Sequence, residues 1–416
     1  MDFQTLQRAA GPGLVFAGAA IGVSHLVQST RAGAMYGAAL IAVIILFNLF
    51  KYPAFRFGLD YAHGTGKTLI GGYRSLSPWL VVVLAVMNMA LLPIGLGAIS
   101  MSTAAILAAV TGSELPILTL TFIVIAVTLI LLLAGGYGWL ERLSKFLLVF
   151  LTLATVWAAA LAFPQVQWSS AFSFDWAMDP MAILFVVALA GFMPTVMGQS
   201  VDISLWTLTS QNEAGGHEKL SLDASRKGFL AAYLLTSFLA VCFCILGAGV
   251  MHAGGITAES GAADLASQII GLYGDTLGPV PAFFAGIAAL CIMVTTMAAS
   301  FDGAARGYGA MYQEYRGDIG GTAGKSTYAL FLILFSVLSF VFLSLMLDSF
   351  TTFIDLVTSI FFVVAPATAL VNHLVMTRCE MPDSHRPSPT IRALSLVGIV
   401  VMSALAVVFF ILKAGG

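Results

Sequence analysis

Charged residues are scarce in this chain. They make up only 9% of the 416 residues, whereas hydrophobic residues make up 59%, and both values lie far from those of soluble proteins. The net charge of −2 leaves no basic surplus that would attract nucleic acid. No acyl-transfer triad and no metalloprotease helix occurs, so we expect neither an enzyme nor a bound cofactor.

Motifs for disulfides, structural zinc and nucleotides are also missing. The spacing of the four cysteines fits neither a zinc site nor a disulfide framework, and we interpret them as small buried hydrophobic residues. The segment 64–68 reads GTGKT, which is only part of a phosphate-loop pattern. Any transport must therefore run downhill or be driven by an ion gradient.

Long apolar stretches dominate what is present. Eleven of them are long enough to cross a hydrocarbon core of roughly 30 Å, and the loops between them are short, so we expect one transmembrane domain over residues 1–416. The predicted spans are 12–30, 36–58, 79–108, 116–134, 143–163, 181–209, 228–250, 281–303, 327–347, 351–376 and 392–412.

The positive charges predict the orientation. With the N-terminus inside, all of the 18 Lys and Arg residues, Lys51 included, fall on the inner side except Arg31 and Lys413. The opposite loops carry acidic residues alone. We therefore expect a multi-pass integral membrane protein, in the cytoplasmic membrane if the source is bacterial.

Two of the predicted spans are interrupted at matching places. The breaks lie at Ala20–His25 in the first span and at Ala190–Thr195 in the sixth. An interrupted helix survives in a bilayer only where its freed backbone groups line a cavity, and a matching pair indicates a transporter's substrate site. We expect an all-α protein with a 5+5 inverted repeat (12–163 and 181–376) and an extra helix at 392–412.

Several motifs resemble the Nramp family of proton-coupled divalent-metal transporters. Gly11–Gly13 and Arg31–Gly37 stand where that family has GPG and QAGAxYG at the ends of span 1, and Ala190–Pro194 matches its A-x-x-M-P. Gly138–Leu143 is similar to the start of its span 5. The resemblance implies a leucine-transporter-like fold with eleven spans.

The same comparison reveals departures from the family's metal site. Gly22 stands where the family has its metal-binding Asp, and His25 stands where it has Asn. The carbonyl and thioether ligands carry over to Ala190 and Met193. The other site positions that differ are Val23 and Ser24 for Pro and Gly, Thr195 for His and Thr358 for a span-10 Gln.

A metal site built from the remaining donors lacks a formal negative charge. His25, Met193 and the carbonyl of Ala190 would be its ligands, with the hydroxyls of Ser24 and Thr195 and the backbone at Gly22 completing the substrate site. An anionic ligand would contribute several kcal/mol even at an effective dielectric of about 20. His25 bonded to freed carbonyls and Met193 in plain packing remain alternatives.

Three charged residues inside the predicted spans point to function. Arg31 and Asp355 have similar predicted heights and resemble the outer gate of related transporters, with a static ion pair as the alternative. Asp202 lies in the inner half of span 6. We expect it to carry a proton or to attract cations to the inner vestibule. Thr358 joins these gating or coupling positions.

The sequence therefore favours a secondary-active transporter of a small cation, with a divalent transition metal first. A carrier of a small organic solute such as an amino acid or amine, and a sensor that binds without transporting, remain open. The expected partners are the lipid bilayer and a metal ion or small molecule. A proton or sodium ion is open as co-substrate, and nucleic acid is excluded.

Overall fold

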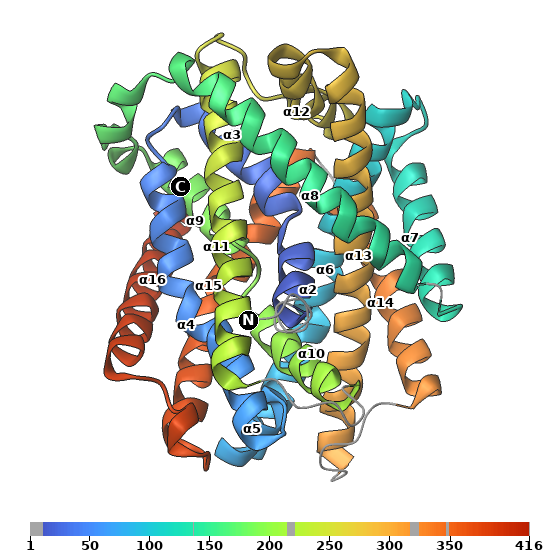
Figure 1. Cartoon of the computed structure of the whole chain (residues 1–416), viewed down its shortest axis with the longest axis vertical. Coiled ribbons are helices and arrows are strands. Elements are labelled where there is room, and N and C mark those ends of the chain that lie inside the picture. Colours follow the sequence, from blue (N-terminus) through green and yellow to red (C-terminus); the bar gives the residue numbers. More distant parts are fainter. Residues whose placement is uncertain (1–10, 136, 214–220, 317–323, 347–348, 416) are drawn as a thin grey trace.

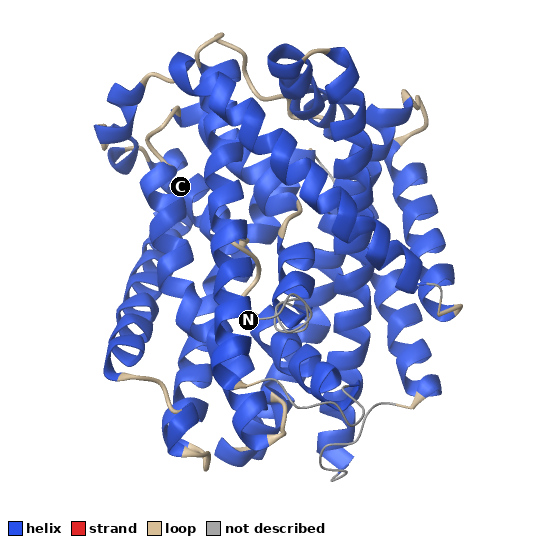
Figure 2. Cartoon of the chain, viewed as in Figure 1, coloured by secondary structure: helices blue, strands red, loops and turns tan. Residues whose placement is uncertain are grey.

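Most of the described residues lie in helices. The computed structural model describes residues 11–135, 137–213, 221–316, 324–346 and 349–415, and these ranges contain no strand (Figure 2). The prediction of an all-helical chain is confirmed. The helices are α2 (Gly11–Ala20), α3 (Thr30–Tyr36), α4 (Ile41–Thr65), α5 (Leu69–Leu76), α6 (Pro78–Thr111), α7 (Ile117–Leu133), α8 (Tyr137–Ala162), α9 (Pro180–Gly191), α10 (Gln199–Glu213), α11 (Leu222–Leu246), α12 (Ala262–Leu277), α13 (Pro279–Arg316), α14 (Lys325–Met346), α15 (Phe350–Arg378) and α16 (Pro389–Gly415).

Local sequence signals explain where several of these helices begin and end. The hydroxyl of Ser221 accepts a hydrogen bond from the backbone N–H of Ala224 and caps α11, and Ser349 caps α15 in the same way. Helices α4 and α6 end at Gly66 and Gly112, both with φ of 66°, a left-handed conformation that glycine adopts without a steric penalty. These residues therefore define the starts of α11 and α15 and the ends of α4 and α6.

Each of the eleven predicted spans coincides with one helix or a pair of helices. Among the described residues, eight helices are long and apolar enough to cross a membrane, while α7 and α9 are shorter apolar helices. The exact span count and the inverted repeat remain predictions. Two helices, α5 and α12, were not expected, because the sequence before spans 3 and 8 suggested loops.

The interrupted first helix lies in the middle of the bundle (Figure 1). Helix α2 packs against α11, α13 and α10, while α10 also packs against α4. Helix α16 lies at one edge and packs on α15 and α4. We call the end of the bundle with α5 the α5 side, and the end with α12 the α12 side. The breaks in the helices thus lie deep inside the protein.

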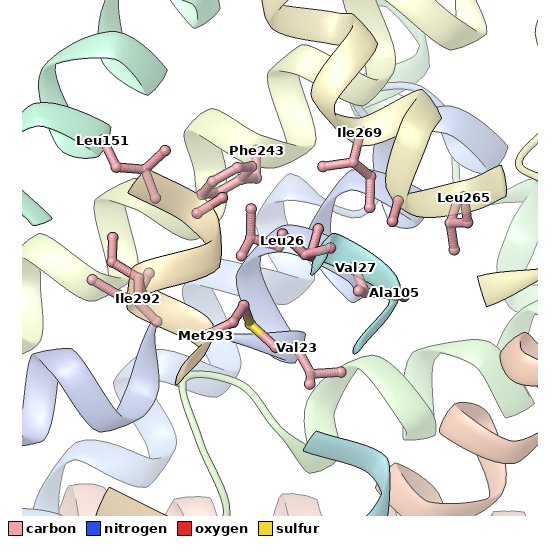
Figure 3. Close-up of a cluster of buried hydrophobic side chains, with 14 of the residues drawn as sticks. Val23, Leu26, Val27, Ala105, Leu151, Phe243, Leu265, Ile269, Ile292 and Met293 are labelled. Atoms are coloured by element: carbon pink, nitrogen blue, oxygen red, sulfur yellow. The ribbon is translucent and has the colours of Figure 1, made fainter. Parts of the chain in front are cut away.

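A buried apolar cluster holds the segment after the first break. Leu26 and Val27, from the π-helix η1 (Val23–Ser29), lie in one cluster with Leu265 and Ile269 of α12 (Figure 3). Because a π-helix is rarely stable alone, this packing fixes η1 between the two halves of the first helix. Helix α12 therefore positions the candidate site from the α12 side.

Candidate transport site

The first break is short, and a threonine of α13 satisfies the backbone there. Ile21 and Gly22 separate α2 from η1. The hydroxyl of Thr296 lies 2.7 Å from the carbonyl oxygen of Gly18 and 3.1 Å from that of Ile21. It donates to carbonyl groups that lost their helical partners when the helix stopped. A Cβ at Gly22 would lie 3.1 Å from the Thr296 methyl group, so the backbone approaches α13 closely.

The second break frees carbonyl groups at the end of α9, and a lysine binds them. Residues 192–198 separate α9 from α10. Lys51 of α4 is fully buried, and its Nζ donates to the carbonyl oxygens of Ala190 at 2.5 Å and Gly191 at 3.1 Å. The C-terminal end of a helix carries partial negative charge, so an ammonium group is electrostatically favoured here.

A hydroxyl group joins the two breaks and contacts His25. The Ser24 Oγ lies 3.0 Å from the carbonyl oxygen of Ala20 and 3.1 Å from that of Pro194. The buried ring of His25 lies 2.7 Å from Ser24 Oγ through Nδ1 and 2.9 Å from the carbonyl of Thr236 through Nε2. Since a carbonyl only accepts, Nε2 carries a proton. Both ring nitrogens of His25 are therefore engaged within the protein.

A cavity lies between the breaks and extends toward the α5 side. About 120 Å³ is open there to the centres of water molecules. Its walls come from α2 and η1, α6, α10, α13, α15 and the second break. They carry apolar groups, a few hydroxyls and amides, and one charged group among the described residues, Asp202.

Two polar groups on the cavity wall have no hydrogen-bond or ion-pair partner within the described part of the chain. The carboxylate of Asp202 forms no hydrogen bond or ion pair within the described part of the chain, and lies 3.4 Å from where a Cβ of Gly303 would be. The Oε1 of Gln199 is buried without a hydrogen-bond partner, which is costly unless a ligand or water supplies a donor or cation. Both groups belong to the first turn of α10.

The cavity is closed on the α12 side by a polar network. Arg31 and Asp355 form a two-pronged ion pair, with Nη1–Oδ1 at 2.7 Å and Nη2–Oδ2 at 2.9 Å. The Gln28 side chain accepts from Arg31 at 2.9 Å and donates to Asp355 at 3.0 Å and Thr358 Oγ1 at 3.2 Å. The guanidinium carbon of Arg31 also lies 5.2 Å from the ring centre of Phe185. This network connects η1, α3, α9 and α15.

The structure separates the predicted site residues into groups. Gly22, Ser24, Thr195 and Asp202 line the cavity. The three predicted metal ligands do not line it: they are His25, Met193 and Ala190, all 0–1% exposed. Arg31, Asp355 and Thr358 lie together in the network on the α12 side. No group of three or more His, Cys, Asp or Glu residues could hold a metal within the described ranges.

Three polar residues of the site were not predicted from the sequence. Lys51 was assigned to the inner side as one positive charge among many, and this was wrong: it is fully buried in α4 and reaches the second break. Its position inside an apolar run was the available signal. Gln28 and Gln199 are uncharged, so the sequence contained no comparable signal for them. The side chains of 138–143, used for the span-5 resemblance, lie outside the described residues.

The interrupted helices and the cavity between them define a membrane transporter fold, and comparisons identify its family. The chain belongs to the Nramp family: the model for natural resistance-associated macrophage protein-like sequences matches residues 13–412. An uncharacterised protein of Pasteurella multocida is 31% identical over 413 residues, covering 98% of this chain and 93% of the relative. The chain is a family transporter and not an enzyme.

Two solved structures share this fold at low identity. A manganese transporter of Eremococcus coleocola, in complex with an aromatic bis-isothiourea substituted compound, has a TM-score of 0.72 and 13% identity, covering 97% of this chain and 86% of that one. MhsT in complex with L-phenylalanine has a TM-score of 0.63 and 15% identity, covering 96% and 98%. These similarities establish the fold and leave the cargo open.

Proposed function

We propose that this chain is a secondary-active transporter that moves a small cation by alternating access. The observation that supports it is the cavity at the two helix breaks, whose single charged lining residue among those described, Asp202, is an unpaired carboxylate. A half-buried carboxylate without a partner in an apolar cavity wall favours a positively charged ligand. Freed carbonyl groups and helix ends at the same depth add partial charges.

The arrangement corresponds to one state of the transport cycle. The Arg31–Asp355 pair closes the α12 side, and the cavity lining continues toward the α5 side through Thr368 and Met311. The distribution of positive residues predicts that the α5 side faces the cytoplasm. The structure would then be inward-facing, with the ion pair as its outer gate.

A divalent transition metal is the first cargo that we propose. Membership of the Nramp family supports it, and the manganese transporter of Eremococcus coleocola has the same fold. Asp202 would supply the anionic charge that the first break lacks. Ligation by His25 and Met193 requires their side chains to turn toward the cavity, with His25 releasing Ser24.

A small organic amine is the second cargo, favoured by Lys51. Its Nζ donates a hydrogen bond to the carbonyl oxygen of Ala190, which is one of the three predicted metal ligands. A divalent ion 4 Å from a protonated lysine would be repelled by about 8 kcal/mol at an effective dielectric of about 20. A monovalent ammonium bound further away, at Asp202, would avoid most of this repulsion.

Equilibrium dialysis of the purified transporter distinguishes the two cargoes. Saturable binding of labelled manganese that is lost in His25→Ala would establish a metal site containing this imidazole. Saturable binding of labelled methylamine without manganese binding would favour the organic cation. Binding of neither class would contradict the proposal that the cargo is a cation.

The thioether of Met193 should discriminate between metals. If Met193 is a ligand, Met193→Ala weakens cadmium binding by about tenfold more than manganese binding, because thioether sulfur is a soft donor. Competition dialysis of the two metals measures the ratio. Met402→Ala is the matched control, since Met402 is a fully buried methionine of α16 that does not line the cavity. Equal weakening of both metals in Met193→Ala would mean that this sulfur binds neither.

The outer gate should leak when its ion pair is broken. Asp355→Asn removes the charge that Arg31 holds through two bonds, and a loss of about 1 kcal/mol raises the population of the open state about fivefold. Efflux from preloaded proteoliposomes should rise by a similar factor. Asp302→Asn, which breaks the Arg306 pair, is the control. Unchanged efflux in Asp355→Asn would mean that the pair is only structural.

A further inference from the structure

The environment of Lys51 is unusual for a lysine. Its side chain is 0% exposed and arises from the middle of the apolar helix α4. Among the described residues its Nζ has no carboxylate partner, and its contacts are the carbonyl oxygens of Ala190 and Gly191. Buried lysines are otherwise almost always paired with an acid. The two oxygens must therefore supply most of the stabilisation of its charge.

The location of these oxygens explains why a cation is held there. Ala190 and Gly191 are the last residues of α9, where the helix is interrupted inside the bundle. The terminal carbonyls of a half-helix lack α-helical partners and carry the negative end of its dipole. The carbonyl of Ala190 accepts a long bond, at 3.4 Å, from the backbone N–H of Met193. Carbonyl oxygens at such ends are ligands that transporters use for free cations. The ammonium of Lys51 occupies that position.

The end of α9 also lies directly against α15. The backbone of Gly191 is so close to Thr358 that a Cβ would lie 1.9 Å from its carbonyl oxygen. Thr358 in turn contacts Gln28 of the network on the α12 side. A cation at the end of α9 therefore stabilises the contact between α4, α9 and α15 at the depth of the breaks.

We propose that Lys51 is a tethered cation: its ammonium fills a cation site formed by the carbonyls of Ala190 and Gly191. The chain therefore requires no free ion at this position, and the site becomes available to a free monovalent cation only when the side chain is removed. The ligand class is a small monovalent cation of ammonium type. This inference bears on the cargo, because an ammonium at Ala190 disfavours a divalent ion there, but its test measures stability and not transport.

The test measures thermal unfolding of the purified full chain in detergent. Lys51→Ala should lower Tm at low salt, and methylammonium or ammonium chloride should raise its Tm by about 3 °C with saturation. Choline chloride at the same ionic strength should have no such effect, because its headgroup is too large for the vacated space. Wild type and Lys227→Ala, which changes a 70% exposed lysine, should respond equally to all three salts.

A second pair of variants separates the effect of the charge from that of the hydrogen bonds. The same pair tests the proposal if Lys51→Ala does not fold. Lys51→Arg keeps a cation and should retain a low-salt Tm close to that of wild type. Lys51→Gln keeps a donor without a charge and should lose Tm and respond to ammonium. The proposal is overturned if Lys51→Gln matches wild type without a salt response, or if Lys51→Ala responds no more than wild type. Neither readout involves transport, so a failure here is distinct from a failure of the proposed function.

Discussion

Asp202→Asn is expected to abolish most of the cation uptake. The amide has nearly the shape of the carboxylate, so packing against Gly303 is retained, while the single charged group on the described cavity wall is lost. Uptake at low cargo concentration should fall at least about tenfold, because about 1.4 kcal/mol of lost attraction suffices for that factor. Initial rates in proteoliposomes measure it.

An acidic residue away from the cavity provides the control for that experiment. Asp223 is 74% exposed and pairs with Lys227 on the surface of α11, so Asp223→Asn removes the same charge without touching the cavity. Its uptake should match that of wild type. If Asp202→Asn also transports at the wild-type rate, the cavity carboxylate does not recognise the cargo.

Gly191→Ala is expected to destabilise the protein more than any conservative surface change. A Cβ at this position would lie 1.9 Å from the carbonyl oxygen of Thr358, and backbone atoms of two packed helices cannot yield as a flexible side chain would. Forcing α9 away from α15 should cost at least about 3 kcal/mol. Thermal or denaturant unfolding in detergent measures the loss.

Gly271→Ala is the matched control because nothing lies within 4 Å of its added Cβ. This position is inside α12, where alanine favours the helix over glycine by about 1 kcal/mol. Its stability should stay equal or rise slightly. A Gly191→Ala variant as stable as wild type would contradict the close packing of α9 on α15.

Hydrophobicity and break residues were sufficient to predict the framework of this fold. Apolar runs of spanning length predicted helices at all eleven positions, since lipid admits few alternatives. The short polar breaks also predicted where helices stop, although the structure refines them to Ile21–Gly22 and to 192–198. Helix α12 was missed because it is too short and too polar to register as a span.

Side-chain partners could not be predicted in the same way. Arg31 and Asp355 are 324 positions apart and were paired because their predicted heights agreed and because they resemble the outer gate of related transporters. Their contact is present, whereas its gating role stays a prediction. Lys51 contacts carbonyl groups 139 and 140 positions away, which no local pattern encodes. The ring of His25 could equally have faced the cavity or the neighbouring helix, and only packing decides between them.

Uptake of manganese and methylamine into proteoliposomes shows whether Asp202 recognises a transported cation. Vesicles with wild-type protein, with Asp202→Asn or without protein are compared under an inside-negative membrane potential. We predict saturable uptake of at least one of the two cations by wild type, with a loss of at least about tenfold in Asp202→Asn. Uptake by wild type no faster than by empty vesicles, or saturable uptake unchanged in Asp202→Asn, would contradict it.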